Sequence, residues 1–385
     1  MIPAVLPKTA KKTKDKNGHK AWMSELVKKH GTPLFVIDKS KLQGQVERFR
    51  KALPRVTPFF AVKANPCTDI VRTFADMGIG FDVASRNEIE SVFSCGVTPD
   101  RMVFANTTKR PADLKYAVGK DVTLMTFDSE YELHKLAKHA PGARVLVRIK
   151  VPNVGSTVEL SIKFGVDPGD AIPLLIKAYK LGLKPVGLSF HVGSQCTKVE
   201  NYVEAFEMAS IIMKDARLKQ LPFEILDIGG GFPITHFDHE DDLFDTMAPV
   251  IGKELDRLFD DSIRIIAEPG RFLAGPAGML IMRVVGKSIR MNKHWYYLDD
   301  GVYGCLSGII YDHCKYQYKV LKKGQTQIST IAGPTCDSLD VISYTEDMPE
   351  MDVGDIVYVE NIGAYSYATA TNFNSIPPAK VIFEK

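Results

Sequence analysis

The sequence lacks several features that would place it in a specialised class of protein. Its 385 residues carry a formal net charge of only +3 with Lys and Arg spread along the chain, so we expect no nucleic-acid partner. No segment approaches the about 20 consecutive apolar residues of a membrane span, and no apolar run of signal-peptide length opens the chain. We therefore expect a cytoplasmic protein whose partner is a small molecule.

Cysteine is also too sparse and scattered to organise the fold. The six residues show no CxxC and no Cys/His spacing, so we predict neither a metal site nor a disulfide framework. A reducing compartment such as the cytosol fits this use of cysteine best. The positions are Cys67, Cys95, Cys196, Cys305, Cys314 and Cys336.

The first 22 residues are rich in lysine and poor in apolar residues. We interpret them as a solvated, partly frayed terminus, with a targeting or interaction tail as the alternative. The lysines are Lys8, Lys11, Lys12, Lys14, Lys16 and Lys20.

Eight short runs rich in β-branched and aromatic residues follow one another, and helical spacing of apolar residues separates them. Eight βα units predict an α/β fold with a closed (β/α)8 TIM barrel. A doubly wound open sheet uses the same alternation, but no run has the character of an edge strand. The runs are 56–65, 78–85, 101–106, 124–129, 143–151, 185–194, 223–233 and 264–272.

After residue 275 the pattern changes to alternating strands and turns with almost no helical periodicity. We predict a separate C-terminal β domain of the sandwich or barrel kind, and the short strand 33–38 is expected to pair with it. The expected division is a barrel at 36–275 and a β domain assembled from 1–35 and 276–385.

Active sites of TIM barrels lie at the C-terminal ends of the strands, and Lys63 follows FFAV at such an end. An apolar setting is expected to lower the pKa of this lysine and to favour amine nucleophile chemistry. Taken alone, Lys63 is better interpreted as a strand-end lysine that reaches out to solvent, and the case for chemistry depends on its neighbours.

Other strand ends supply the parts of an anion site. Gly229–Gly231 end the seventh run and would let backbone N–H groups approach a phosphate, and Gly270 and Arg271 follow the eighth. Glu268 is either half of an ion pair with Arg271 or Arg148 or a carboxylate aimed into the site. His191, followed by Ser194, is either a core histidine or a ring that packs on a bound ligand.

Six motifs in order resemble those of the fold-type III pyridoxal-phosphate (PLP) decarboxylases. This alanine-racemase-like group includes ornithine, lysine, arginine and diaminopimelate decarboxylases, and the resemblance spans nearly the whole chain. The motifs are AVKAN around Lys63, FDVAS (81–85), HVGSQ (191–195), DIGGGFP (227–233), EPGRF (268–272) and GPTCDSLD (333–340).

The resemblance implies that PLP is the cofactor and assigns the matching residues. Lys63 would hold PLP as a Schiff base, His191 would stack on its ring, and Glu268 would keep the ring nitrogen protonated, as an electron sink requires. Asp82, Glu88 and Arg148 would form a supporting polar shell. The phosphate would be surrounded by Ser194, Gly230, Gly231, Gly270, Arg271 and Tyr365.

The resemblance also implies a homodimer with shared active sites. The β domain of one subunit would bring Cys336, as proton donor, and Asp337 to the barrel of the other. The long segment 151–165 either closes over the site or is an ordinary surface loop.

The substrate is expected to be a basic amino acid. The sequence has CDS where diaminopimelate enzymes typically carry CES, and Asp337 with Asp312 and Tyr311 would surround a terminal ammonium. We favour ornithine because RVTPFFAVKAN resembles the ornithine-preferring enzymes, with lysine second. One methylene is worth only about 1–3 kcal/mol in a pocket, so activity on both is expected. Arginine and diaminopimelate decarboxylases, a racemase and a non-catalytic regulatory relative are the alternatives.

Overall fold

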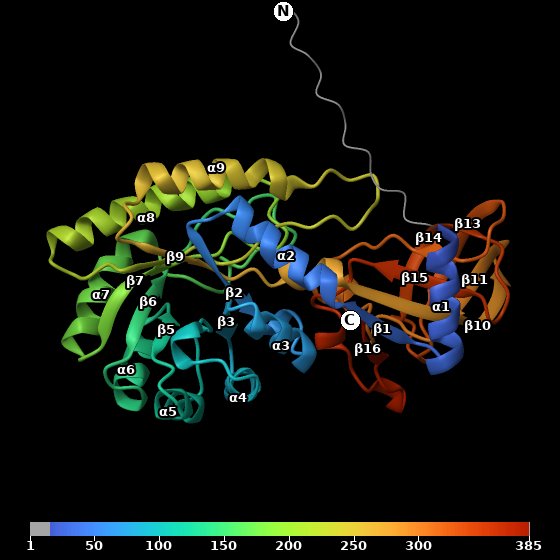
Figure 1. Ribbon diagram of the computed structural model, residues 1–385, viewed down its shortest axis with the longest axis horizontal. Helices are drawn as coiled ribbons and strands as arrows, with labels where there is room; N and C mark the ends of the chain where they lie inside the picture. The colour runs from blue at the N-terminus through green and yellow to red at the C-terminus, as the bar shows by residue number, and fades with distance from the viewer. Residues whose placement is uncertain (1–15, 385) are drawn as a thin grey trace, which may run out of the picture.

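Eight parallel strands close into a barrel in the computed structural model, which describes residues 16–384 (Figure 1). The first and last strands pair directly, with Val56 opposite Ile265, so the predicted barrel is confirmed and the open sheet is excluded. The strands are β2 (Val56–Ala61), β3 (Gly80–Val83), β4 (Met102–Phe104), β5 (Leu124–Phe127), β6 (Arg144–Arg148), β7 (Lys184–Ser189), β8 (Ile225–Asp227) and β9 (Arg264–Ala267).

Amphipathic helices cover the outside of the barrel. In α3, for example, Ile70, Val71 and Phe74 recur at helical spacing and are buried against the strands. The longest helices, α8 and α9, pack against each other. The helices are α2 (Lys39–Ala52), α3 (Thr68–Asp76), α4 (Arg86–Ser94), α5 (Pro111–Gly119), α6 (Glu130–His139), α7 (Ala171–Lys180), α8 (Glu200–Leu218) and α9 (Leu243–Leu258).

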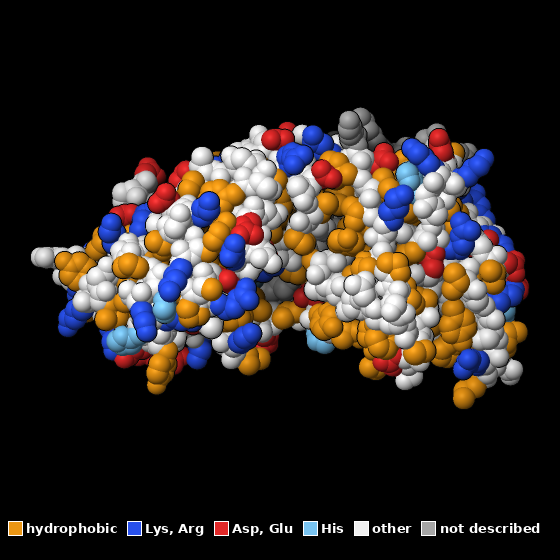
Figure 2. All heavy atoms as spheres, turned by 90° about the horizontal axis from the view of Figure 1, so that it is seen from below, with side chains coloured by type: hydrophobic (Ala, Val, Ile, Leu, Met, Phe, Trp, Pro, Cys, Tyr) orange, Lys and Arg blue, Asp and Glu red, His pale blue; other side chains and the backbone are white. Residues whose placement is uncertain are grey.

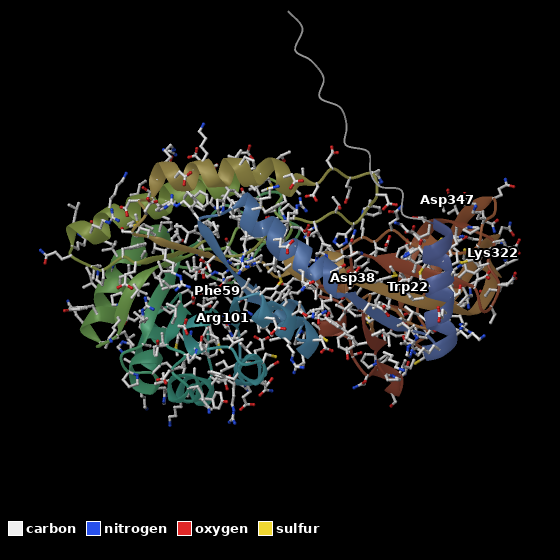
Figure 3. All side chains as sticks on the ribbon, in the orientation of Figure 1. Trp22, Asp38, Phe59, Arg101, Lys322 and Asp347 are labelled. Atoms are coloured by element: carbon white, nitrogen blue, oxygen red, sulfur yellow. The ribbon has the colours of Figure 1, made fainter. Side chains whose placement is uncertain are left out.

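A layer of apolar side chains fills the barrel interior. Phe59, labelled in Figure 3, belongs to this layer, and the Arg264 guanidinium lies 5.5 Å from its ring centroid. Since the interior is packed, a ligand has room only at the mouth of the barrel. The layer consists of Phe59, Val103, Ala105, Leu124, Leu146, Val186, Ile225 and Ile266.

The second domain is a sheet built largely from the C-terminal part of the chain. Its strands run in the order β12-β15-β10-β11-β13-β14. The sequence indicated most of them, but not the two-residue β12 or the polar β14. The strands are β10 (Gly278–Arg290), β11 (Lys293–Leu298), β12 (Lys319–Val320), β13 (Thr326–Ala332), β14 (Val341–Pro349), β15 (Ile356–Glu360) and β16 (Lys380–Glu384).

Both ends of the chain meet in this sheet. Strand β1 (Leu34–Asp38) pairs antiparallel with β10 and parallel with β16. The boundary expected at residue 36 falls inside β1, and the first barrel helix begins only at Lys39. Asp38 lies at this junction (Figure 3) and caps α2, since its Oδ1 accepts hydrogen bonds from the backbone N–H groups of Ser40 and Lys41.

The N-terminal segment is ordered earlier than expected. Helix α1 (Lys16–His30) buries Met23 against β1 and β10, so the prediction of a frayed terminus is wrong from residue 16 onwards. Burial of its apolar face overrides the lysine-rich composition. Lys8, Lys11, Lys12 and Lys14 lie outside the described residues. Among the helices in residues 16–384, none is long and apolar enough to cross a membrane.

Candidate active site

The C-terminal ends of the barrel strands surround a cavity of about 430 Å³. The β domain contributes to its wall through Asp312, which follows α11 (Gly308–Tyr311), and through Tyr365. Most of the expected site residues meet here. Those that line the cavity are Lys63, Arg148, His191, Ser194, Gly231, Glu268, Gly270, Arg271, Asp312 and Tyr365.

Lys63 stands in a short 3₁₀ turn, Val62–Ala64, directly after β2. Its Nζ lies 2.5 Å from Oδ2 of Asp82, a carboxylate at the end of β3 that is almost fully buried. Burial opposes the charge on the amine, but the Asp82 carboxylate outweighs burial and raises the pKa of Lys63. The expectation of a lowered pKa is therefore wrong, because the apolar strand ends beside carboxylates that the strand itself does not reveal.

Three glycines form a cradle that no other residue fits. A Cβ on Gly231, whose φ is +101°, would lie 2.4 Å from the Gly193 carbonyl oxygen. A Cβ on Gly230 would lie 2.7 Å from the Glu268 carbonyl oxygen, and one on Gly270 would lie 3.0 Å from the Tyr365 hydroxyl. Neighbouring protein atoms thus require glycine at these positions, and Gly231 and Gly270 bring backbone without a side chain to the cavity wall.

Arg271 supplies the positive charge beside this cradle. Helix α10 (Arg271–Ala274) begins with it, and its guanidinium lies 4.9 Å from the Tyr365 ring centroid. Its Nε is buried and finds no acceptor among the described residues, which leaves a donor for a bound anion. The guanidinium also pairs with the carboxylate of Asp312. Asp312 was expected to face a substrate ammonium, but here it faces the arginine.

His191 and Glu268 face the same cavity in uncharged states. The His191 Nδ1 accepts a hydrogen bond from the Gly193 backbone N–H at 3.0 Å, and burial with the charges of Arg148 and Lys63 lowers the pKa of His191 well below its ordinary value. Burial raises the pKa of Glu268 well above its ordinary value. A neutral imidazole suits stacking on a ring, and Glu268 enters the site with a proton.

Glu88 and Arg148 belong to the polar shell that was expected around Lys63. Glu88 lies in the first turn of α4 and accepts a hydrogen bond from the Ala84 backbone N–H at 2.6 Å, while burial raises its pKa to about 7. The Arg148 guanidinium lies 4.9 Å from the Phe164 ring centroid. Phe164 belongs to the segment 151–165, which lines the cavity and is tied to Ser194 by backbone hydrogen bonds through Val158.

Three expected site residues lie apart from the cavity. Cys336 is exposed, and its Sγ accepts a hydrogen bond from the Asn374 Nδ2 at 3.3 Å. Asp337 accepts a hydrogen bond from the Tyr303 hydroxyl, and Tyr311 is 64% exposed. Within the described part of this one chain, these residues do not join the cavity wall.

Sequence reasoning missed several residues of the site. Asn106 and Thr107 line the cavity after β4, and their only sequence signal is their place at the end of a strand. Asp227 ends β8 and is fully buried beneath the cavity. The sequence did contain a signal for Asp227, because this residue opens the glycine-rich motif DIGGGFP.

Lys109 is a buried cation that holds the β4–α5 loop. Its Nζ donates to the carbonyl oxygens of Asn106 at 2.8 Å and Thr126 at 2.6 Å, and it pairs with Glu132 at 3.1 Å. Burial lowers its pKa to about 8, so it stays largely charged at neutral pH. The loop that it fixes carries Ala105, Asn106 and Thr107 into the cavity wall.

Replacing Lys109 with methionine is expected to lower the free energy of unfolding by about 3 kcal/mol, because Glu132 and two carbonyl groups lose a buried partner. Urea denaturation followed by circular dichroism measures the change. The control is Lys150→Met, which removes an exposed pair with Asp167 and is expected to cost less than about 1 kcal/mol. Equal losses in the two variants would contradict the role of Lys109.

The cavity fits PLP in three respects: Gly231 and Gly270 bring bare backbone to its wall, Arg271 has an unused donor, and Glu268 Oε1 is buried without a partner among the described residues. This fit puts the chain in the class of PLP-dependent enzymes built on a (β/α)8 barrel. The chain belongs to the pyridoxal-dependent decarboxylase family. The family model for the pyridoxal-dependent decarboxylase, pyridoxal binding domain, matches residues 39–275.

Relatives and solved structures agree with this assignment. The chain is 40% identical over 360 residues to the lysine/ornithine decarboxylase of Selenomonas ruminantium, and the alignment covers 93% of this chain and 91% of that protein. It is 39% identical over 363 residues to the ornithine decarboxylase of Schizosaccharomyces pombe, and that alignment covers 91% of this chain and 82% of the relative. A crystal structure of SrLDC in complex with PLP and cadaverine superposes with a TM-score of 0.88, at 39% identity, covering 94% of this chain and 92% of that one.

Proposed function

We propose that this enzyme decarboxylates L-ornithine to putrescine and CO2, a reaction of polyamine biosynthesis, and that it accepts L-lysine, with cadaverine as product, as a second substrate. The observation that carries the proposal is the pair of carboxylates Asp312 and Asp337. Asp312 lies in the cavity wall, and Asp337 is half-buried beside the exposed Cys336 on the β domain. Two carboxylates suit the terminal ammonium of a diamino acid. The names of the relatives support the same substrates.

The enzyme acts as a cytoplasmic homodimer in this proposal. Cys336 and Asp337 lie outside the cavity of their own chain, so a second subunit has to bring them to it. The surface around them is apolar: Leu339 is 67% exposed, and the rings of Tyr303 and Phe373 stack at 4.3 Å. Hydrophobic side chains gather on the β-domain half of the face shown in Figure 2, as an interface between subunits requires. All six cysteines are free, which suits a reducing cytoplasm.

Different residues of the chain have different roles in the reaction. PLP, when bound, supplies the electron sink that takes up the bonding electrons as CO2 leaves. Lys63 would supply the amine that holds PLP, and the buried Asp82 carboxylate positions that amine. The neutral His191 orients the ring from one face, and Arg271 with the glycine cradle holds the phosphate.

Substrate binding and protonation fall to the acidic residues and the thiol. Arg271, which pairs with Asp312, would hold the phosphate of PLP, and Asp312 would then be free to bind the substrate ammonium. Asp337 of the second subunit binds the same ammonium. Cys336 of that subunit donates the proton that replaces the carboxylate on the α-carbon.

The assay that tests the proposal measures CO2 released from carboxyl-labelled ornithine, lysine, arginine and meso-diaminopimelate. The expected order of kcat/KM is ornithine, then lysine, with the other two far behind. Preference for arginine or diaminopimelate would replace the proposed substrate. Inversion of the substrate without CO2 would indicate a racemase, and no reaction with any of them would favour a regulatory relative.

Replacing Asp337 with alanine is expected to raise the KM for ornithine by about 10- to 100-fold, because a charge-assisted hydrogen bond to the ammonium is lost. Steady-state CO2 release measures the change. The control is Asp347→Ala, an exposed aspartate of β14 at the far end of the β domain (Figure 3), which should keep the wild-type KM. An unchanged KM in Asp337→Ala would remove this residue from the substrate site.

A further inference from the structure

Two carboxyl groups lie against each other beneath the cavity. Asp227 ends β8 and is 0% exposed, while Glu268 follows β9, is 7% exposed and shares a side-chain hydrogen bond with Asp227. Asp227 Oδ2 and Glu268 Oε1 find no donor within residues 16–384. An ionised carboxylate has no hydrogen to donate, so one member of the pair holds a proton.

The proton resides on Glu268 at neutral pH. Burial raises the pKa of Glu268 well above its ordinary value, and the charges of Asp227 and Asp82 raise it further. Burial raises the pKa of Asp227 only to about 6, because the Glu268 side chain and the Gly229 backbone N–H, 2.9 Å from Oδ1, donate hydrogen bonds to the Asp227 carboxylate. Asp227 is therefore the ionised acceptor of the pair.

The surrounding charges are consistent with this distribution. Two cations, Lys63 and Arg148, then face two ionised carboxylates, Asp82 and Asp227, so the buried site is close to neutral. Asp227 itself does not line the cavity among the described residues, so it acts on a ligand only through Glu268. The other titratable groups around the cluster are Glu88, Asp128, His191 and Tyr365.

We propose that Asp227 is a positioning residue that stores, on Glu268, the proton that the ring nitrogen of PLP requires. The inference rests on the proposed pairing of Glu268 with that nitrogen. As PLP binds, Glu268 gives its O–H proton to the ring nitrogen and becomes the carboxylate that accepts a hydrogen bond from it. The transfer takes no proton from water, and the new positive and negative charges lie side by side.

The variant that tests this is Asp227→Asn. The asparagine keeps Oδ1 as acceptor for the Gly229 N–H, so the glycine turn is retained, but the negative charge is lost and its amide donates to Glu268. The pKa of Glu268 should fall, and Glu268 should be ionised at neutral pH. Binding of PLP to the cofactor-free variant is then expected to take up about one more proton than in the wild type, so Kd should rise about tenfold more per pH unit above pH 7.

Isothermal titration calorimetry of PLP binding, in buffers with different ionisation enthalpies, counts these protons. The matched control is Asp300→Asn, another buried aspartate whose Oδ1 caps a glycine turn through Gly301 N–H, and it should keep the wild-type count. Infrared spectra of the cofactor-free proteins provide a second measurement. The difference spectra, wild type minus Asp227→Asn and wild type minus Glu268→Gln, should each show the C=O band of one protonated carboxyl.

Different results would contradict the pairing of Glu268 with the ring nitrogen and the role of Asp227. If Glu268→Gln binds PLP with wild-type affinity and pH dependence, the pairing of Glu268 with the ring nitrogen is wrong. If Glu268→Gln weakens binding but Asp227→Asn keeps both the wild-type proton count and the infrared band, the pairing stands and Asp227 stores no proton.

Discussion

Replacing Lys63 with alanine is expected to abolish turnover and the visible absorbance of covalently bound PLP. The Lys63 amine lines the cavity and pairs with the buried Asp82 carboxylate, whereas the amine of Lys163 in the same wall lies 4.9 Å from the Phe164 ring centroid. The loss in kcat should be roughly 10³-fold or more. Absorbance spectra and CO2 release on the same protein samples measure both effects.

The control for this variant is Lys322→Ala at the far end of the β domain, where the amine pairs with Asp352 and Asp355 (Figure 3). It should keep both the spectrum and the activity of the wild type. A Lys63→Ala protein that retains covalent PLP and turnover would remove Lys63 from the reaction.

Replacing Cys336 with alanine is expected to lower the rate of correct product formation by roughly 10²- to 10⁴-fold, the usual contribution of a positioned proton donor. The α-carbon would then be protonated slowly or at the wrong atom, and side products of transamination type should appear. Chromatography of the amine and carbonyl products measures the partition. Unchanged product formation without such side products would contradict the role of the thiol.

Mixing the two inactive proteins tests whether sites are shared. If Cys336 acts on the barrel of the other subunit, a heterodimer of Lys63→Ala and Cys336→Ala contains one intact site and one doubly damaged site. Equal mixing with free exchange of subunits should restore about a quarter of the wild-type activity. If each site used its own Cys336, mixing would restore nothing, and the subunits would be functionally independent.

Much of the fold could be predicted because its strands are short apolar runs that end in polar or glycine residues. The barrel followed from eight such runs, and the pairing of β2 with β9 confirms the closure. The N-terminus was harder to predict, because the helix that begins at Lys16 is rich in lysine and is stabilised by tertiary contacts such as that of Met23. Strand β14 was missed because most of its side chains face solvent.

The sequence predicted which residues lie around the cavity, but not their protonation states. A place at the end of a strand was the signal, because the C-terminal strand ends of a barrel surround one mouth. The state of Lys63 depends on Asp82, which is 19 residues away, and the pairing of Arg271 with Asp312 joins two domains. Such contacts between distant segments leave no local pattern in the sequence, so the pKa of Lys63 was predicted in the wrong direction.

The parallel pairing of β1 with β16 has a consequence for synthesis of the chain on the ribosome. The barrel segment, residues 39–275, is complete while more than a hundred residues are still to be translated, so it can fold as the chain emerges. Strand β1 is translated before the barrel, whereas its neighbour β16 is translated more than a hundred residues after the barrel segment ends. Until β16 has emerged, β1 has an unpaired edge, and a nascent chain that stalls before β16 would expose that edge to aggregation.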